Sequence, residues 1–176
     1  MRARREKDHL ALSFNQVESR ILRHLLHEVQ SHYRGEVETS SDKQTYIWYS
    51  TRGCQSADMT PEQTQEWLAN MRELKEAAAV SLDRWIEELA PPETTAPTLQ
   101  AQCRLRLSFE DASTFLTALN DLRLITASRA NLGPAELGLE SLGVIAHLPE
   151  EQRAALMQID FLEFVMSKLL LILTEQ

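Results

Sequence analysis

The sequence predicts a mainly α-helical single domain over residues 1–176, a helical bundle-like fold with a minimal two-stranded β element; a third strand is the open alternative. Two observations predict this class. Apolar residues recur every three or four positions along several long segments, which is typical of helices. In two short segments every second residue is apolar, which is typical of strands. With 176 residues and 43% hydrophobic content, the chain is long enough to build one sizeable core.

The two predicted strands carry the same short motif. Residues 10–14 read LALSF and residues 105–109 read LRLSF, and each motif runs directly into a helical pattern. A lone strand leaves its backbone groups without partners, so we expect the two strands to pair with each other. Residues 1–8 are basic but interrupted by Glu6 and Asp8, and they read as a flexible arm.

Two long helices are predicted before the second strand. The first is amphipathic and runs from Val17 to about Tyr33. The second begins at the capping sequence Thr60-Pro61 and ends near Leu89, before two prolines. Its apolar residues are spaced by three or four throughout: Trp67, Met71, Leu74, Ala78, Leu82, Trp85 and Leu89. This stripe predicts packing against another long helix or against a second copy of the chain.

Weaker patterns separate these helices. Residues 34–59 read as a variable insertion or loop, in which Tyr46–Tyr49 is either an edge strand or an apolar arm. Residues 90–101, rich in proline and threonine, form a connector to the second strand and to a helix over 108–129. The last helix starts near Pro149. Its apolar residues are too many for one stripe, which places it centrally in the core or at a subunit interface.

Composition excludes some classes of function. The chain has 26 acidic against 18 basic residues and a formal net charge of −8, which argues against direct nucleic-acid binding. Its longest apolar run, Leu169–Leu173, is far shorter than the ~20 residues that span a bilayer, so no membrane association is expected. No signal-peptide pattern opens the chain, which predicts a cytoplasmic protein.

No motif in the sequence predicts catalytic residues, a cofactor or a metal. His27 and His32 lie five residues apart, whereas the zinc-protease helix needs four. Glycine-rich phosphate loops and nucleophile elbows are missing. Cys54, which follows Arg52-Gly53 in the sequence, and Cys103 are candidate thiols; a redox pair would need Cα atoms within roughly 7 Å.

The helix over 108–129 carries a polar cluster on an otherwise apolar sequence. Its members are Asn120, Asp121, Arg123 and Arg129. Because Arg123 lies between two leucines, we expect it to be partly buried and paired with a carboxylate, for which Glu140, Glu150 and Asp160 are candidates. The cluster is either a polar network that tethers helices or a recognition site for a partner or an anionic ligand.

The segment 118–129, ALNDLRLITASR, followed by QIDFLEFVMSKLL at 158–170, resembles an uncharacterised bacterial family classed as a domain of unknown function. The family is frequent in actinobacteria and is often encoded beside the Clp protease adaptor. The resemblance covers residues 9–33 and 103–173, whereas 35–59 differs. It implies a role in regulation or stress response, and it offers no catalytic assignment to transfer to this chain.

These observations predict a non-enzymatic interaction or regulatory protein of the cytoplasm, with an unidentified protein partner and a possible homodimer. The first alternative is a ligand- or redox-sensing regulator that uses Cys54 and Cys103 or the Arg123 cluster. The second alternative is a small enzyme whose catalytic residues form no motif that is recognisable in the sequence.

Overall fold

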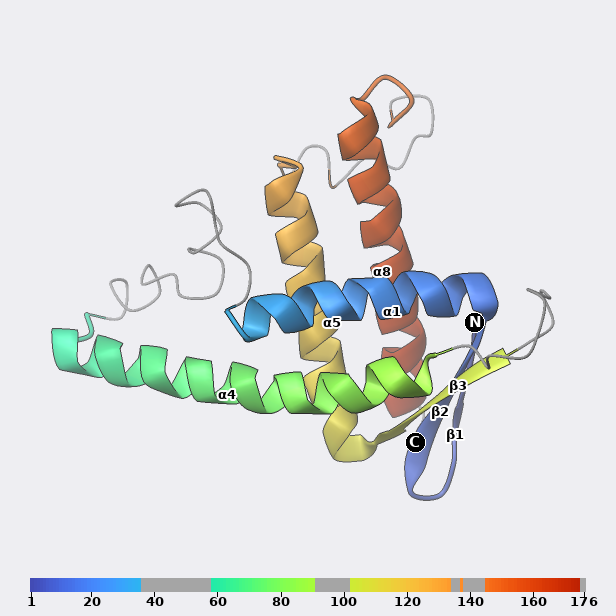
Figure 1. The fold of residues 1–176 in the computed structure, drawn as a ribbon, viewed down its shortest axis with the longest axis horizontal. Coiled ribbons are helices and arrows are strands. Elements are labelled where there is room, and N and C mark those ends of the chain that lie inside the picture. The colour runs from blue at the N-terminus through green and yellow to red at the C-terminus, as the bar shows by residue number, and fades with distance from the viewer. Residues whose placement is uncertain (36–57, 91–101, 134–136, 138–144, 175–176) are drawn as a thin grey trace.

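The computed structural model describes residues 1–35, 58–90, 102–133, 137 and 145–174. Its elements follow in the order β1 (Arg2–Arg5), β2 (His9–Asn15), α1 (Gln16–Tyr33), α4 (Pro61–Glu88), β3 (Gln102–Ser108), α5 (Phe109–Arg129) and α8 (Glu150–Thr174). In this part of the chain, four long helices pack around one small sheet (Figure 1). The predicted fold class, mainly α with a minimal β element, is confirmed.

The sheet has the strand order β1-β2-β3, and both pairings are antiparallel. The predicted pairing of the two Leu-x-Leu strands is confirmed, since Leu10 lies opposite Leu107 and Leu12 opposite Leu105. The third strand is β1. The alternative edge strand at Tyr46–Tyr49 lies outside the described residues.

The expectation that residues 1–8 form a flexible arm is wrong for Arg2–Arg5. These residues pair with Leu10–Ser13 of β2, so their backbone groups have partners in the sheet. Ala3 also packs against the core, and the amino terminus lies 2.5 Å from the Glu18 carboxylate. The sequence pattern alone did not reveal these tertiary contacts.

Each helix that follows a strand begins at a side-chain cap. Asn15 Oδ1 accepts a hydrogen bond from the Glu18 amide at 2.9 Å, and Ser108 Oγ accepts one from the Asp111 amide at 3.0 Å. Thr60 caps α4 in the same way, with proline at the first position of the helix. These caps satisfy amides that a helix start leaves unpaired, which explains why strand changes to helix at these residues.

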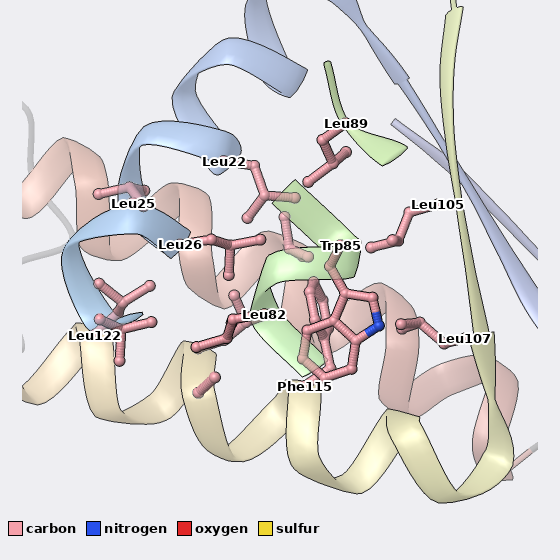
Figure 2. Packing of buried hydrophobic residues seen from close by; sticks show 14 of the residues in the cluster. Leu22, Leu25, Leu26, Leu82, Trp85, Leu89, Leu105, Leu107, Phe115 and Leu122 are labelled. Carbon is pink, nitrogen blue, oxygen red and sulfur yellow. The ribbon is translucent and has the colours of Figure 1, made fainter. Parts of the chain in front are cut away.

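The core lies between the inner face of the sheet and the helices. The rings of Trp85 on α4 and Phe115 on α5 meet edge to face, with centroids 5.2 Å apart and an interplanar angle of 87°. Figure 2 shows leucines of the same core that come from α1, from α4 and its C-cap, from β3 and from α5: Leu22, Leu25, Leu26, Leu82, Leu89, Leu105, Leu107 and Leu122. Burial of these side chains is the main stabilising contribution to the fold.

The predicted apolar stripe of α4 is buried only along the second half of the helix. Leu82 and Trp85 are fully buried, whereas Trp67 and Met71 are half-buried and Leu74 is 64% exposed. The Pro61 end of α4 extends beyond α1, its neighbour, which accounts for this gradient (Figure 1).

Helix α8 buries one face and exposes apolar residues on the other. Leu162, Val165 and Leu169 are fully buried in the main core, while Met157 and Leu171 are 72% and 53% exposed. The expected central position therefore holds for the inner face of α8, which packs on α5. Among the described residues, no helix has the length and apolar content needed to cross a bilayer.

Candidate functional site: an arginine-lined hollow on the sheet

The outer face of the sheet carries four arginines in two rows. Because Leu10, Leu12 and Phe14 of β2 face the core, the alternating residues Ala11 and Ser13 face outward. The register of β2 with its two neighbouring strands completes each row. Arg2 and Arg104 flank Ser13 on its two sides, and Arg4 and Arg106 flank Ala11.

This face forms a hollow of about 340 Å³. Ala11 and Ser13 line it together with the four arginines, Ala3 and Glu6. Ala11 is only 5% exposed, although it alternates with the core-facing residues of β2. Strand spacing places the flanking arginines of one row roughly 10 Å apart and the two rows roughly 7 Å apart. The guanidinium groups therefore surround a small, uncharged floor.

Most of these guanidinium groups form no ion pair with a described residue, although the Glu88 carboxylate accepts a hydrogen bond from the Arg106 backbone amide at 3.1 Å. Arg4 pairs with Glu6, but Arg2, Arg104 and Arg106 form no ion pair with another described residue. All four arginines are exposed. A guanidinium group donates hydrogen bonds in a planar fork that matches carboxylate and phosphate oxygens. The arrangement is therefore suited to bind an anion.

Glu6 is the acidic group at the rim of the hollow. Its carboxylate contacts Arg4 through one oxygen and lies 2.5 Å from His9 Nε2 through the other. Partial desolvation raises the pKa of this carboxyl, but Arg4 and His9 outweigh that effect and hold the pKa below its ordinary value. Glu6 is thus ionised at neutral pH, and its ion pair with Arg4 engages one of the four arginines.

The polar cluster predicted on α5 is not one site. Asp121 is buried, and its carboxylate accepts hydrogen bonds from Tyr33 of α1 and Lys75 of α4. Burial raises the pKa of Asp121, and the two hydrogen bonds offset this only in part. Burial and the nearby Asp121 also raise the pKa of the Tyr33 phenol, which stays protonated. A hollow of about 220 Å³ adjoins Tyr33 and Lys75 between α4 and α5.

The other cluster members point away from Asp121. Arg123 is half-buried and pairs with Glu163 of α8 at 3.0 Å, so the candidate partners Glu150 and Asp160 were wrong. The third candidate, Glu140, lies outside the described residues. Arg129 pairs with Glu28 of α1 at 2.6 Å. Asn120 is half-buried. These pairs connect α5 with α8 and with α1, which supports a tethering role.

Cys103 does not present its thiol on the surface. It lies on β3 opposite Phe14, on the inner face of the sheet, and is 5% exposed. Cys54 lies outside the described residues, so the distance between the two candidate thiols stays a prediction. Within the described ranges, no group of three or more His, Cys, Asp or Glu side chains is placed to hold a metal ion.

Sequence reasoning missed the arginine-lined hollow although its signal was present. Arg104 and Arg106 alternate with leucines, and Arg2 and Arg4 flank Ala3, so each pair lies on one face of a strand. Only the register of β1 and β3 on β2 brings the two pairs together.

The family model described as "Domain of unknown function (DUF2017)" matches residues 1–173. The chain belongs to the DUF2017 family. The match includes every described strand and nearly all of the described helices, so the arginine-lined hollow lies within the DUF2017 domain. No curated protein and no solved structure matches the sequence significantly.

Proposed function

We propose that this DUF2017 protein is a non-enzymatic interaction or regulatory protein of the cytoplasm, and that it recognises an anionic group in the arginine-lined hollow. The observation that carries the proposal is the register of the sheet, which places four exposed arginines around Ala11 and Ser13. Four like charges so close together repel one another, and a bound anion relieves that repulsion.

The charge of the whole chain makes this surface unusual. The formal net charge is −8, and removing the four positive charges of the hollow leaves −12. An anion that approaches elsewhere meets repulsion, whereas the hollow attracts it. Such charge complementarity contributes to the specificity and the rate of association.

A pull-down from the source organism tests this function. The parent protein is compared with the variant Arg104→Gln/Arg106→Gln, and a control variant, Arg20→Gln/Arg72→Gln, removes two exposed arginines that do not line the hollow. We expect the parent and the control to retain one specific partner or ligand, identified by mass spectrometry, and the first variant to lose it. Equal recovery by all three proteins would contradict the proposal.

The outer face of α8 supports the homodimer that the sequence suggested. Met157, Phe164, Lys168 and Leu171 are exposed on this face and follow one another at intervals of seven, four and three residues. This is the spacing with which two helices pack along a shared seam. Sedimentation velocity of the parent and of Phe164→Lys tests it. We expect a dimer for the parent and a monomer for the variant, and a monomeric parent would exclude the dimer.

The redox-sensing alternative has less support, because burial of Cys103 restricts the access of an oxidant to its thiol. The small-enzyme alternative has one observation in its favour, the buried Lys75 beside the second hollow. However, the amine of Lys75 is held in an ion pair with the Asp121 carboxylate, so it is not free to attack a substrate.

A further inference from the structure

We infer that the arginine-lined hollow binds a compact polyphosphate group, with the charge and size of inorganic triphosphate or of the phosphate chain of a nucleotide. This inference rests on the proposed function, since it names the class of anion. Three observations carry it: the density of positive charge, the size of the hollow and the acidity of the remaining chain.

The density of positive charge favours several phosphates over one carboxylate. Four guanidinium groups surround a floor formed by two small residues, Ala11 and Ser13. A single carboxylate has one charge and satisfies one guanidinium fork. A chain of phosphates has several charges and many acceptor oxygens within a few ångströms, so it can reach arginines of both rows together.

The size of the hollow favours a small ligand. Its volume of about 340 Å³ lies at the lower end of the range of roughly 300–1,000 Å³ found for small-molecule sites. A folded partner or a nucleic-acid duplex would rest on its rim, whereas a phosphate chain fits within it. The hydroxyl of Ser13 on the floor adds a neutral hydrogen-bond donor.

The charge of the remaining chain disfavours a long polyanion. A nucleic-acid strand that entered the hollow would continue over a chain whose other residues total −12. Repulsion between exposed charges acts over roughly 8–10 Å at physiological salt, so phosphates beyond the hollow would be repelled. A compact ligand keeps all its charge over the four arginines.

The Glu6 carboxylate competes with an entering anion for the guanidinium group of Arg4. This carboxylate pairs with Arg4 in the absence of ligand. An entering phosphate must replace that contact, so Glu6 lowers the affinity for weakly charged anions and selects those of higher charge. The contact of Glu6 with His9 gives the displaced carboxylate a second partner.

Isothermal titration calorimetry with inorganic triphosphate tests the inference on the purified full chain. Orthophosphate and citrate serve as anions of lower charge density, and a nucleoside triphosphate distinguishes a free polyphosphate from a nucleotide. Hexaglutamate and a single-stranded oligonucleotide represent the acidic-peptide and nucleic-acid classes. We expect triphosphate to bind most tightly of the inorganic and carboxylate probes, and its affinity to fall as salt is added.

The variants locate the binding site. Loss of the hydrogen bonds of one arginine to a charged ligand weakens binding about 10- to 100-fold. We therefore expect at least a tenfold weaker affinity for Arg104→Gln/Arg106→Gln and an almost unchanged affinity for Arg20→Gln/Arg72→Gln. Glu6→Gln should bind triphosphate about two- to fivefold more tightly, because Arg4 no longer has a competing carboxylate.

The outcomes separate this inference from the proposed function. If hexaglutamate or the oligonucleotide binds tightly, triphosphate does not, and the loss again follows Arg104→Gln/Arg106→Gln, then the polyphosphate class is wrong but the hollow still recognises anions. Absence of binding to every probe, or equal loss in both double variants, would overturn the polyphosphate inference. If the pull-down is also unaffected by Arg104→Gln/Arg106→Gln, the proposed function fails too.

Discussion

Two aspartates of α5 that lie ten residues apart, Asp111 and Asp121, have different surroundings and opposite pKa shifts. Asp111 lies in the first turn, where its carboxylate accepts hydrogen bonds from Arg84 at 2.8 Å and from the Ser108 amide at 3.3 Å. These contacts outweigh partial desolvation and lower the pKa of Asp111. Asp121 is buried between α1 and α4, and burial raises its pKa despite the contact with Lys75.

The pKa shifts differ because the two carboxylates lose different amounts of hydration and gain different protein contacts in its place. The Asp111 side chain keeps 22% of its surface exposed and gains a hydrogen bond from the Ser108 amide and an ion pair with Arg84, so its charged form is favoured. Asp121 loses its hydration, and two protein groups must replace it. A buried ion pair contributes little net stability, but removal of one partner leaves an uncompensated charge. The two aspartates should therefore respond very differently to substitution of their partners.

The largest effect is expected for Lys75→Met, which removes the cation beside Asp121. We expect a loss of about 3–5 kcal/mol in the free energy of unfolding, because a buried carboxylate remains without its ion-pair partner. Urea unfolding measures the loss. The double variant Lys75→Met/Asp121→Leu should recover a large part of the lost stability. A single variant within about 0.5 kcal/mol of the parent would show that Asp121 is not buried as described.

Asp111→Ala should cost less, about 0.3–1.5 kcal/mol, because it removes a helix-start contact that is exposed to water. The effect depends on pH in a defined direction. Since the folded state lowers the pKa of Asp111, its contribution is present above the ordinary aspartate range and is lost as the pH falls through the lowered pKa. Unfolding of parent and variant at pH 7 and pH 2 measures this, and a difference that grows in acid would contradict it.

Arg123→Ala should cost about 0–1 kcal/mol. Its partner Glu163 is 50% exposed, and exposed pairs of this kind contribute little to stability. Chemical unfolding of this variant beside Lys75→Met compares an exposed and a buried pair on the same helix. Similar costs for the two substitutions would remove the distinction on which the comparison rests.

The smallest effect is expected for Arg104→Gln/Arg106→Gln. Both side chains are exposed and form no ion pair with a described residue, so the free energy of unfolding should change by no more than about 0.5 kcal/mol. Thermal unfolding measures this. A large loss would mean that these arginines stabilise the fold, and the binding experiments would then need single substitutions.

Much of the fold could be predicted because the relevant signals are local. The alternation at 10–14 and 105–107 predicted the strands β2 and β3, and the capping sequences at Thr60 and Ser108 predicted two helix starts. The buried polar cluster around Asp121 could be predicted only in part. Asp121 was noticed, but its partners Tyr33 and Lys75 lie 88 and 46 residues away, and nothing in the sequence pairs them with it.

By itself, the sequence determined which residues of each strand share a face and where the helices begin, because both depend on side chains only a few positions apart. Only the tertiary structure decided that β1 joins the sheet, which brings Arg2 and Arg4 beside the row that Arg104 and Arg106 occupy. It also decided that Asp121 is buried while Arg123 stays half-exposed. The physical reason is that burial and register depend on segments that are distant in the chain, and no local pattern specifies which of them will meet.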